Sequence, residues 1–284
     1  MEEGQAYWEQ RAAQGQDKDG FEWFSIDYQR LEPLLEDIGA LSPTKKTLEV
    51  GCGTSHLLLK VALARQAKGG KGENVKDNNG SNLSGVDYSP TCIARQRQMM
   101  EQAGLTTKCS NQAPELQVMD ASAMTFSDAH FDVLLDKGAL DSVDMTDCDV
   151  AKCAQEYARI LKRGGQLLLV SCRMPLQRRL ECLEKLPFQL KYGYLIKAPG
   201  QEHAPGGFGA FVLERIMEDN YQFCLKDICL DNYIVADTVS SNTTKQQPWK
   251  DQDNNSHKYY DATNLYANEA DDLFGAMRAE MEAY

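Results

Sequence analysis

The segment that carries the most chemical information is a glycine-containing turn, Glu49-Val50-Gly51-Cys52-Gly53, between an apolar run and a helix-like segment. Glycines at such a turn let the backbone bend sharply and approach a ligand without a Cβ in the way. The pattern is incomplete as a dinucleotide fingerprint, because His56 stands where Gly-x-Gly-x-x-Gly requires its last glycine. From these residues alone, a ligand-binding turn and a turn that only packs its glycines are equally good interpretations.

An aspartate follows the next apolar run, where one carboxylate could accept both ribose hydroxyls of a nucleoside cofactor. This residue, Asp87, lies 34 residues after Gly53, but leaving out the 15 polar residues 68–82 reduces the separation to 19, near the usual spacing of about 20. Asp120 follows the third apolar run and could accept from an adenine amino group, with a helix N-cap as the alternative. Successive strand ends meet at one edge of a parallel sheet, which favours a ligand site there.

The elements that would position these residues alternate between short apolar runs and longer segments with helical periodicity. Buried strands are predicted at 47–51, 83–86, 116–119, 131–135 and 166–171, and helices at 55–66, from the cap Ser89-Pro90 onward, and at 149–162, before the Gly164-Gly165 break. Two further strands, 188–197 and 208–216, are predicted as an antiparallel hairpin. The pattern indicates the α/β class, with a Rossmann-like, seven-stranded, mostly parallel sheet, helices on both faces and a C-terminal antiparallel hairpin.

The chain is predicted to hold one large domain, residues 47–236, between a helical N-terminal segment, 1–46, and a tail, 237–284. Residues 68–82 contain glycine, asparagine and lysine with a single valine, so we expect a flexible surface insertion there. The tail is polar and acidic, and it is expected to hold little order apart from a short amphipathic patch at residues 273–281.

Composition and charge restrict the classes of partner. The 42 acidic and 30 basic side chains give a formal net charge of −12 over 284 residues, which disfavours nucleic acid and anionic lipid surfaces. No apolar run approaches the roughly 18 residues of a membrane span, and the first residues do not resemble a secretion signal. Nine cysteines without a Cys-x-x-Cys pair indicate reduced thiols, and the four histidines lack metal-ligand spacing. We therefore expect a cytoplasmic monomer without a metal site.

Three further segments resemble a known family: Tyr7-Trp8-Glu9-Gln10-Arg11, Phe21-Glu22-Trp23-Phe24 and Leu135-Asp136-Lys137-Gly138-Ala139-Leu140-Asp141. With the glycine turn, Asp87 and Asp120, they resemble class I S-adenosylmethionine-dependent methyltransferases. More narrowly, the chain is similar to the methyltransferase-like lysine methyltransferases that act on translation elongation factor 1-alpha. The resemblance covers about residues 5–235 and, faintly, 268–280. It implies S-adenosyl-L-methionine as the cofactor and elongation factor 1-alpha, a basic protein, as the substrate.

The resemblance also implies roles for individual residues at the cofactor. Gly51, Cys52 and Gly53 would hold its methionine end, and Asp87 would bind its ribose. Tyr88 would lie beside the adenine, and Asp120 and the backbone of Ala121 would bind the adenine edge. Trp8 and Trp23 would belong to an N-terminal lid, and Lys137 would contact the cofactor at the end of the fourth strand. For the two tryptophans, a helix packed on the core is the alternative. The chain departs from the family at Ala12, where an aromatic residue is typical, and at Thr54, where asparagine is typical.

A lysine acceptor has a reference pKa of about 10.4 and must lose a proton before it can attack a methyl group. Asp136 and Asp141 are the candidate proton acceptors, and the alternative roles for them are a helix cap and an ion pair with Lys137. Residues 136–149 carry five acidic side chains against one lysine, so this edge fits a cationic lysine on a basic protein partner.

Other functions remain open at this point. A methyltransferase of the same fold could act on a protein N-terminus or on a small molecule, and a cofactor-binding interaction protein could lack turnover. An NAD-dependent oxidoreductase is disfavoured by the missing third glycine of the turn. An adenine-N6 methyltransferase is disfavoured because the fourth strand ends in Asp136-Lys137-Gly138, where those enzymes carry an Asn/Asp-Pro-Pro-aromatic motif.

Overall fold

The computed structural model describes residues 2–14, 22, 26–69, 81–105, 113–145, 149–172, 177–196, 208–216 and 234–235. The predicted insertion, 68–82, is described only at its two ends. Trp23 and the predicted tail, 237–284, with its amphipathic patch, lie outside the described residues. In the described part of the chain, no helix has the length and apolar character that a membrane crossing requires.

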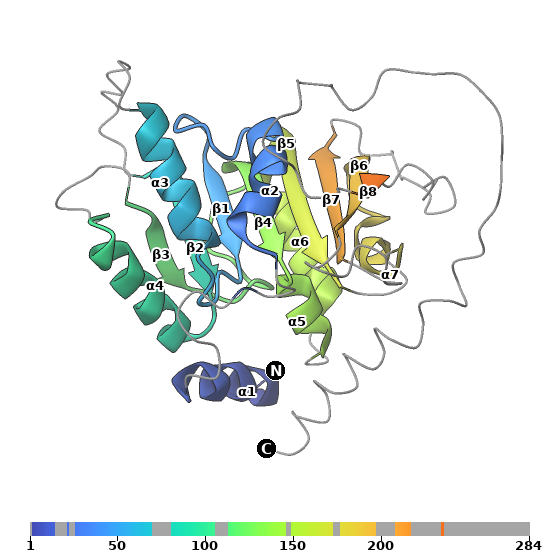
Figure 1. Ribbon diagram of the computed structural model, residues 1–284. Coiled ribbons are helices and arrows are strands. Elements are labelled where there is room, and N and C mark those ends of the chain that lie inside the picture. Colours follow the sequence, from blue (N-terminus) through green and yellow to red (C-terminus); the bar gives the residue numbers. More distant parts are fainter. Residues whose placement is uncertain are drawn as a thin grey trace.

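The centre of the fold is an eight-stranded sheet with the strand order β3-β2-β1-β4-β5-β7-β6-β8 (Figure 1). Its strands are β1 (Thr47–Val50), β2 (Leu83–Asp87), β3 (Glu115–Val118), β4 (Phe131–Lys137), β5 (Leu161–Ser171), β6 (Phe188–Ile196), β7 (Phe208–Arg215) and β8 (Ile234–Val235). The first five strands pair in parallel, and β7 is antiparallel to both β5 and β6. The predicted sheet and hairpin are confirmed, with the two-residue β8 as one additional strand parallel to β6.

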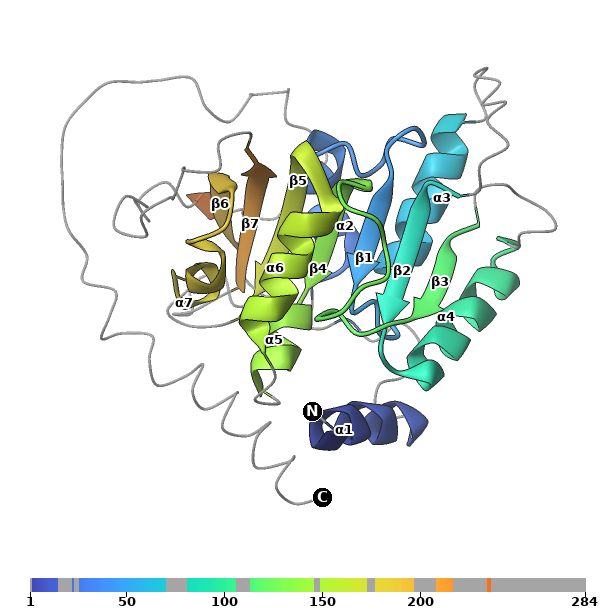
Figure 2. The same cartoon turned by 180° about the vertical axis from the view of Figure 1, so that it is seen from behind.

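Helices cover both faces of the sheet, as predicted. They are α1 (Glu2–Ala13), α2 (Tyr28–Asp37), α3 (Leu57–Gly69), α4 (Pro90–Gln102), α5 (Ala139–Met145), α6 (Val150–Ile160), α7 (Gln177–Leu180) and the 3₁₀ turn η2 (Glu181–Leu183). Figure 1 shows the face covered by α2 and α3, and Figure 2 shows α6 on the opposite face. The predicted cap of α4 is confirmed, because the Ser89 side chain accepts from the Cys92 N–H and Pro90 is the first helical residue.

The alternation of side chains along β4 builds two separate cores. Val133 and Leu135 point toward the core that contains Leu58 of α3, whereas Leu134 between them packs in the core that contains Tyr157 of α6. All of these side chains are fully buried, with at most 1% of each surface exposed. Because successive side chains of a strand point to opposite faces, a continuous apolar run predicts this double coverage.

The predicted boundary between α6 and β5 is wrong. The helix predicted over 149–162 ends at Ile160, and β5 begins at Leu161 rather than after the two glycines. Leu161 adopts an extended conformation and pairs with Phe131, and the strand then continues through the glycines with a shift in register against β4. The apolar Leu161 is fully buried at this edge of the sheet, so its burial favours the strand over another helical residue.

Candidate cofactor site

The predicted glycine turn joins β1 to α3 and has the backbone geometry that only glycine adopts readily. Gly51 and Gly53 have φ angles of +63° and +50°. At Gly51 space is also restricted, because a Cβ there would lie 2.7 Å from the Cβ of Ala139. Cys52 between them is buried in the core, and burial raises the pKa of its thiol well above the usual value, so it packs as a small apolar side chain.

Asp87 at the end of β2, the predicted ribose acceptor, is hydrogen-bonded to this turn. One carboxylate oxygen accepts from the Gly53 N–H at 2.9 Å, and the other accepts from the Ser89 N–H at 2.9 Å. Burial raises the pKa of Asp87 to about 6. Each carboxylate oxygen has a second lone pair, so Asp87 can hold the turn and also accept hydroxyl groups of a ligand.

Gln96 of α4, which sequence reasoning missed, holds the same turn from the helix side. Its side-chain nitrogen donates to the carbonyl oxygens of Cys52, Gly53 and Ser55 at 3.3, 3.1 and 2.8 Å. The side chain is completely buried. A signal was present in the sequence, since Gln96 occupies a position three residues from the buried Ile93 and Met99 on the apolar face of α4.

Glu49 at the carboxyl end of β1 is a buried acidic residue that precedes the two glycines of the turn. It is 1% exposed, and burial raises its pKa to about 8, although the positive charge of Lys137 offsets part of this increase. Its Oε2 atom has no hydrogen-bond partner within the described residues. A buried carboxylate oxygen without a donor fits a cationic ligand group, such as the ammonium of a bound amino acid.

Lys137 lies at the end of β4, as predicted, and its side chain is only 4% exposed. Its ammonium forms an ion pair with Glu22 and donates to the carbonyl oxygen of Ile26 at 3.2 Å. Glu22 also accepts from the Ser55 hydroxyl and from the His56 N–H, both at 2.9 Å. Sequence reasoning assigned no role to Glu22, because an acidic residue in an irregular segment has no periodicity or spacing to reveal it.

Helix α1 lies beyond the sheet edge at which β2 ends, in both views of the molecule (Figures 1 and 2). Trp8 packs on Met145 and Cys172, at the ends of α5 and β5. One turn of α1 also contacts the start of α4, because Glu9 accepts from the Ser89 hydroxyl and from the Thr91 side chain and N–H. Helix α1 therefore reaches from the end of β2 to the end of β5, across the edge where the predicted cofactor residues gather.

The predicted adenine residues lie beside Asp87. The Met119 N–H donates to the Asp87 carbonyl at 2.9 Å, which holds the end of β3 against the end of β2. Asp120 is exposed and accepts from the Ser122 N–H at 2.7 Å and from its hydroxyl at 2.8 Å. The alternative of a helix N-cap is wrong, because residues 121–130 form turns and irregular structure. Tyr88 and Ala121 are half-buried at the same edge.

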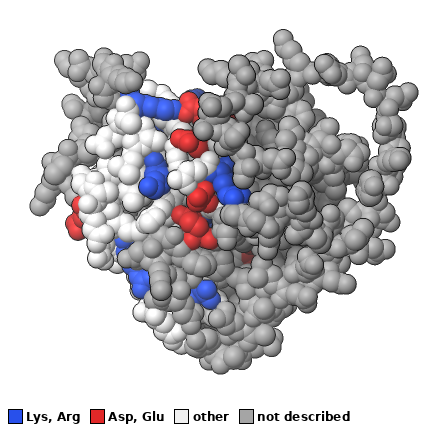
Figure 3. Space-filling model, viewed as in Figure 1, with Lys and Arg blue, Asp and Glu red and all other residues white. Residues whose placement is uncertain are grey.

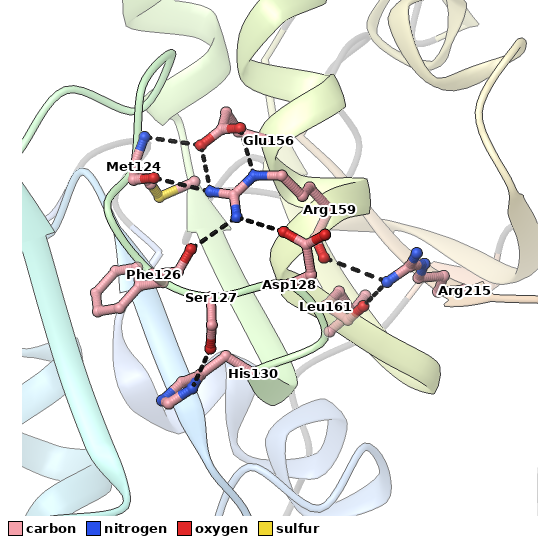
Figure 4. A network of polar contacts seen from close by, with 9 residues as sticks. All are labelled: Met124, Phe126, Ser127, Asp128, His130, Glu156, Arg159, Leu161 and Arg215. Carbon is pink, nitrogen blue, oxygen red and sulfur yellow. Dashed lines mark hydrogen bonds and ion pairs between the residues drawn. The ribbon is translucent and has the colours of Figure 1, made fainter.

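Arg159 of α6 holds the loop that follows Asp120 (Figure 4). Its guanidinium donates to the carbonyl oxygens of Met124 and Phe126 at 2.8 and 2.7 Å, and to Glu156 and Asp128 at 2.7 and 2.8 Å. Glu156 in turn accepts from the Met124 N–H at 2.7 Å. One arginine, directly and through Glu156, therefore fixes a loop that has no regular secondary structure of its own.

We expect Arg159→Met to lower the free energy of unfolding by about 2–3 kcal/mol, since two loop carbonyls and Glu156 lose a charged donor. The pair with Asp128 adds little, because that carboxylate is 79% exposed. Urea unfolding of this variant beside Arg163→Met, a change at an exposed residue of β5, measures the difference. Equal midpoints for the two variants would contradict the assigned role of Arg159.

The two candidate proton acceptors are buried and already accept hydrogen bonds from the fold. Asp136 accepts from the Ala139 and Leu140 N–H groups, at 2.8 and 3.2 Å, and from the Tyr157 hydroxyl at 2.8 Å. Burial raises the pKa of Asp136 to about 7. These contacts match the alternative of a cap on α5, and the catalytic assignment of Asp136 stays a prediction.

Asp141 accepts from the Ser171 hydroxyl at 2.7 Å and from the Cys172 N–H at 2.8 Å. Its ionic partner is Arg179 at 2.8 Å, rather than Lys137 as the alternative interpretation expected. Arg179 also pairs with Asp144 at 3.1 Å, so part of the acidic charge that follows β4 is neutralised within the fold. The catalytic assignment of Asp141 likewise stays a prediction.

The described surface shows no dominant charged patch on the face in view, where acidic and basic side chains are interspersed (Figure 3). Across the described ranges, no group of three or more histidine, cysteine, aspartate or glutamate side chains is arranged to hold a metal ion. The chemically distinctive region is therefore the edge formed by the glycine turn, Asp87, Glu49 and Lys137.

Comparisons with known proteins agree with this geometry. The family model "Methyltransferase domain" matches residues 41–203. A Xenopus laevis protein named "eEF1A lysine and N-terminal methyltransferase" is 35% identical over 173 residues, which are 58% of this chain and 21% of that protein. A Mus musculus protein named "EEF1A lysine methyltransferase 4" is 29% identical over 182 residues, 60% of this chain and 61% of that protein. The chain thus spans about a fifth of the first relative and about three fifths of the second.

The crystal structure of a SAM dependent methyltransferase from Aquifex aeolicus has a TM-score of 0.50 at 12% identity, and covers 72% of this chain and 98% of that one. At this identity the likeness supports the fold alone. The family model, in contrast, matches more than half of the chain and includes β1 to β6 with the glycine turn, Asp87 and Lys137. The predicted family is confirmed, and the chain belongs to the methyltransferase domain family.

Proposed function

We propose that this chain is an S-adenosylmethionine-dependent protein-lysine N-methyltransferase that acts on translation elongation factor 1-alpha. The observation that carries the cofactor assignment is Asp87, held at the glycine turn by the N–H groups of Gly53 and Ser89. The acceptor assignment is supported by two relatives, whose names state that they are methyltransferases of eEF1A. The reduced thiols and the charge of −12 support a cytoplasmic enzyme that acts on a protein rather than on nucleic acid.

The described residues fit the parts of this cofactor. Asp87 would accept the ribose hydroxyls, and the turn of Gly51 to Gly53 leaves room for the methionine end. The free oxygen of Glu49 would accept a hydrogen bond from the ammonium group of the methionine part. Lys137, together with the lid residues Trp8 and Trp23 and the adenine residues Tyr88, Asp120 and Ala121, would complete the site.

When bound, the cofactor supplies a methyl group on a positively charged sulfonium, whose charge disappears as the methyl leaves. The protein contributes mainly by in-line positioning of donor and acceptor. Glu22 pairs with the Lys137 ammonium, and Glu49 lies within range of the charges of Lys137, Glu22 and Asp87. When ionised, these carboxyl groups favour a cationic cofactor and lower the cost of bringing a lysine side chain to the same edge.

We expect Asp136→Asn to lower the free energy of unfolding by about 1–3 kcal/mol. The carboxylate accepts hydrogen bonds from three donors with two oxygens, whereas asparagine offers them only one oxygen. If Asp136 positions α5, the variant keeps the shape of the wild-type kcat–pH profile at a lower amplitude. Loss of the profile's limb near pH 7 would instead identify Asp136 as the group that takes the acceptor's proton. Asp141→Asn, measured in parallel, applies the same criterion to the second candidate.

The proposed function is tested by incubating the full chain with purified elongation factor 1-alpha and tritiated S-adenosylmethionine. We expect label on the factor, and mass spectrometry of the labelled band to place it on a lysine side chain. Asp87→Ala serves as the control with a damaged cofactor site. Label that enters only small molecules would exclude a protein substrate.

A second acceptor is a protein N-terminus, because the Xenopus laevis relative is named for both lysine and N-terminal methylation. The same mass spectra separate the two acceptors, since an N-terminal methyl group appears on the first peptide of the factor. A factor with a blocked N-terminus should still be labelled if the acceptor is a lysine.

A further inference from the structure

Glu22 joins two parts of the cofactor site that are far apart in the sequence. Its Oε1 accepts from the His56 N–H at 2.9 Å, and its Oε2 accepts from the Ser55 hydroxyl at 2.9 Å and pairs with the Lys137 ammonium. Ser55 and His56 lie between the glycine turn and the first residue of α3, and Lys137 ends β4. One carboxylate thus contacts both the loop and the strand end that flank the site.

The position of Glu22 at the start of α3 is favourable for a negative charge. The first N–H groups of a helix have no partner within the helix, and a carboxylate there accepts a charge-assisted hydrogen bond. The Ser55 hydroxyl donates to Glu22 and accepts from the Leu57 N–H at 3.0 Å, so the carboxylate, the serine and the helix form one chain of hydrogen bonds. The side chain of Glu22 is 17% exposed, which limits the solvent screening of its pair with Lys137.

Lys137 has a second carboxylate within range of its charge, that of Glu49. In the described arrangement, the Lys137 ammonium is bound to Glu22 and to the Ile26 carbonyl, and Glu49 keeps an oxygen without a donor. Without Glu22, a buried ammonium would turn to the remaining carboxylate, because an unpaired buried charge is costly. Glu49 would then no longer offer a free oxygen to a cationic ligand.

We infer that Glu22 is a positioning residue for the cofactor, which acts by holding Lys137 away from Glu49. This inference rests on the proposed function, because it assigns the free oxygen of Glu49 to the cofactor's ammonium. Glu22 lies between α1 and α2 in the chain, and its contacts make it part of the site.

The competing explanation is that Glu22 only attaches the N-terminal segment to the domain. Glu9 provides the matched comparison, because it also lies in the N-terminal segment and contacts a helix start, that of α4, through Ser89 and Thr91. Both acids therefore attach the segment, and contact with Lys137 distinguishes Glu22 within the described residues. If attachment alone mattered, Glu9→Gln and Glu22→Gln would behave alike toward changes at Lys137.

The test is calorimetric titration of the full chain with S-adenosylmethionine and with S-adenosylhomocysteine. The variants are Glu22→Gln, Glu9→Gln and Lys137→Gln, and the two double variants that combine each glutamate change with Lys137→Gln. We expect Glu22→Gln to weaken binding of S-adenosylmethionine at least about tenfold. Because Glu22 acts through Lys137, the Glu22→Gln/Lys137→Gln double variant should bind the cofactor no more weakly than Lys137→Gln alone. The effects of Glu9→Gln and Lys137→Gln on the binding free energy should instead add.

Wild-type affinity in Glu22→Gln, or additive effects of Glu22→Gln and Lys137→Gln, would overturn the inference. Glu22→Gln could fail to fold if it leaves the Lys137 ammonium without its ionic partner. In that case the Glu22→Gln/Lys137→Gln double variant still tests the inference, because it lacks both charges and its affinity is compared with that of Lys137→Gln. Thermal unfolding of each variant shows which of them are folded. If the wild-type chain itself binds neither cofactor form, the proposed function fails, and that outcome is distinct from failure of the inference about Glu22.

Discussion

Replacing Gly51 by alanine is expected to abolish measurable cofactor binding and to lower the free energy of unfolding by about 3–5 kcal/mol. The new Cβ would lie 2.7 Å from the Cβ of Ala139 and 3.4 Å from its Cα. Ala139 cannot move away easily, because its N–H donates to Asp136 at the start of α5. The φ angle of +63° adds the conformational strain that any L-residue has there.

Gly104→Ala is the matched control for this variant. Gly104 has a similar φ angle, +75°, but a Cβ built there has no atom within 4 Å. This control therefore has only the conformational cost, about 1–2 kcal/mol. Urea unfolding measures the stabilities, and titration with S-adenosylhomocysteine measures the binding. Equal destabilisation of the two variants would show that the contact with Ala139 is not the cause.

A compensating change gives a second test of the same contact. Adding Ala139→Gly to Gly51→Ala removes the methyl group that the new Cβ meets, at the cost of a glycine in α5, about 1 kcal/mol. We expect the double variant to be more stable than Gly51→Ala alone. A double variant less stable than both single variants would place the conflict elsewhere in the turn.

The features that the sequence predicted correctly are those written in local patterns. Apolar runs with glycine or aspartate at their ends predicted the strands, and the glycine turn predicted the tight connection from β1 to α3. Leaving out the polar segment 68–82 gave the usual separation between a glycine turn and a ribose-binding acidic residue, and the structure adds a hydrogen bond between Asp87 and Gly53. Strand ends of a parallel sheet share one edge, so local patterns also placed these residues together.

The features that the sequence did not predict depend on contacts between distant segments. Glu22 lies 115 residues before Lys137, and an acidic residue in an irregular segment is the most ordinary of surface residues until its partners are known. Asp141 and Arg179 are also distant in the sequence, so Lys137 was considered as the partner although Arg179 is the residue in contact. The two residues of β8 are too few for any periodicity.

Gln96 is an intermediate case, since a glutamine on an apolar helix face is a visible irregularity. Its meaning became clear only with the three carbonyl groups of the glycine turn that it contacts. A buried amide is tolerated where it binds backbone groups that have no other donor. An irregular residue within a regular pattern therefore indicates a special position, and the structure is needed to identify the function of that position.

Asp87→Ala is expected to weaken the binding of S-adenosylmethionine by about a hundredfold or more, because two charge-assisted hydrogen bonds to the ribose are lost, each contributing about 1.5–3 kcal/mol at most. The Gly53 and Ser89 N–H groups also lose their acceptor, so the turn itself becomes less ordered. Titration calorimetry measures the affinity of wild type and variant. Unchanged affinity would show that the ribose is bound elsewhere.

Asp87→Asn separates the charge of this residue from its shape. With a pKa of about 6, the wild-type carboxylate is ionised above pH 6 and can accept both ribose hydroxyls, whereas protonation removes one acceptor site. Wild-type affinity should therefore fall as the pH decreases from 7 to 5. The asparagine variant should bind weakly over this range with little dependence on pH.

The stability of the cofactor-free protein should change with pH in the opposite direction. A folded-state pKa raised from 3.8 to about 6 means that the stability contributed by protonated Asp87 is complete below pH 3.8 and is lost as the pH rises through 6. Asp136, with a pKa of about 7, and Glu49, with a pKa of about 8, extend this loss toward alkaline pH. Ionisation of Asp87 thus destabilises the cofactor-free protein and strengthens cofactor binding over the same pH range.

These opposite trends can be measured in one series of thermal unfolding curves from pH 5 to 8, with and without S-adenosylmethionine. We expect the stabilisation by cofactor to increase with pH in the wild type. In Asp87→Asn the part of the increase centred near pH 6 should disappear, while the part from Glu49 remains. If the variant keeps the increase near pH 6, another group controls cofactor binding there, and the assignment of Asp87 as the ribose acceptor would have to be given up.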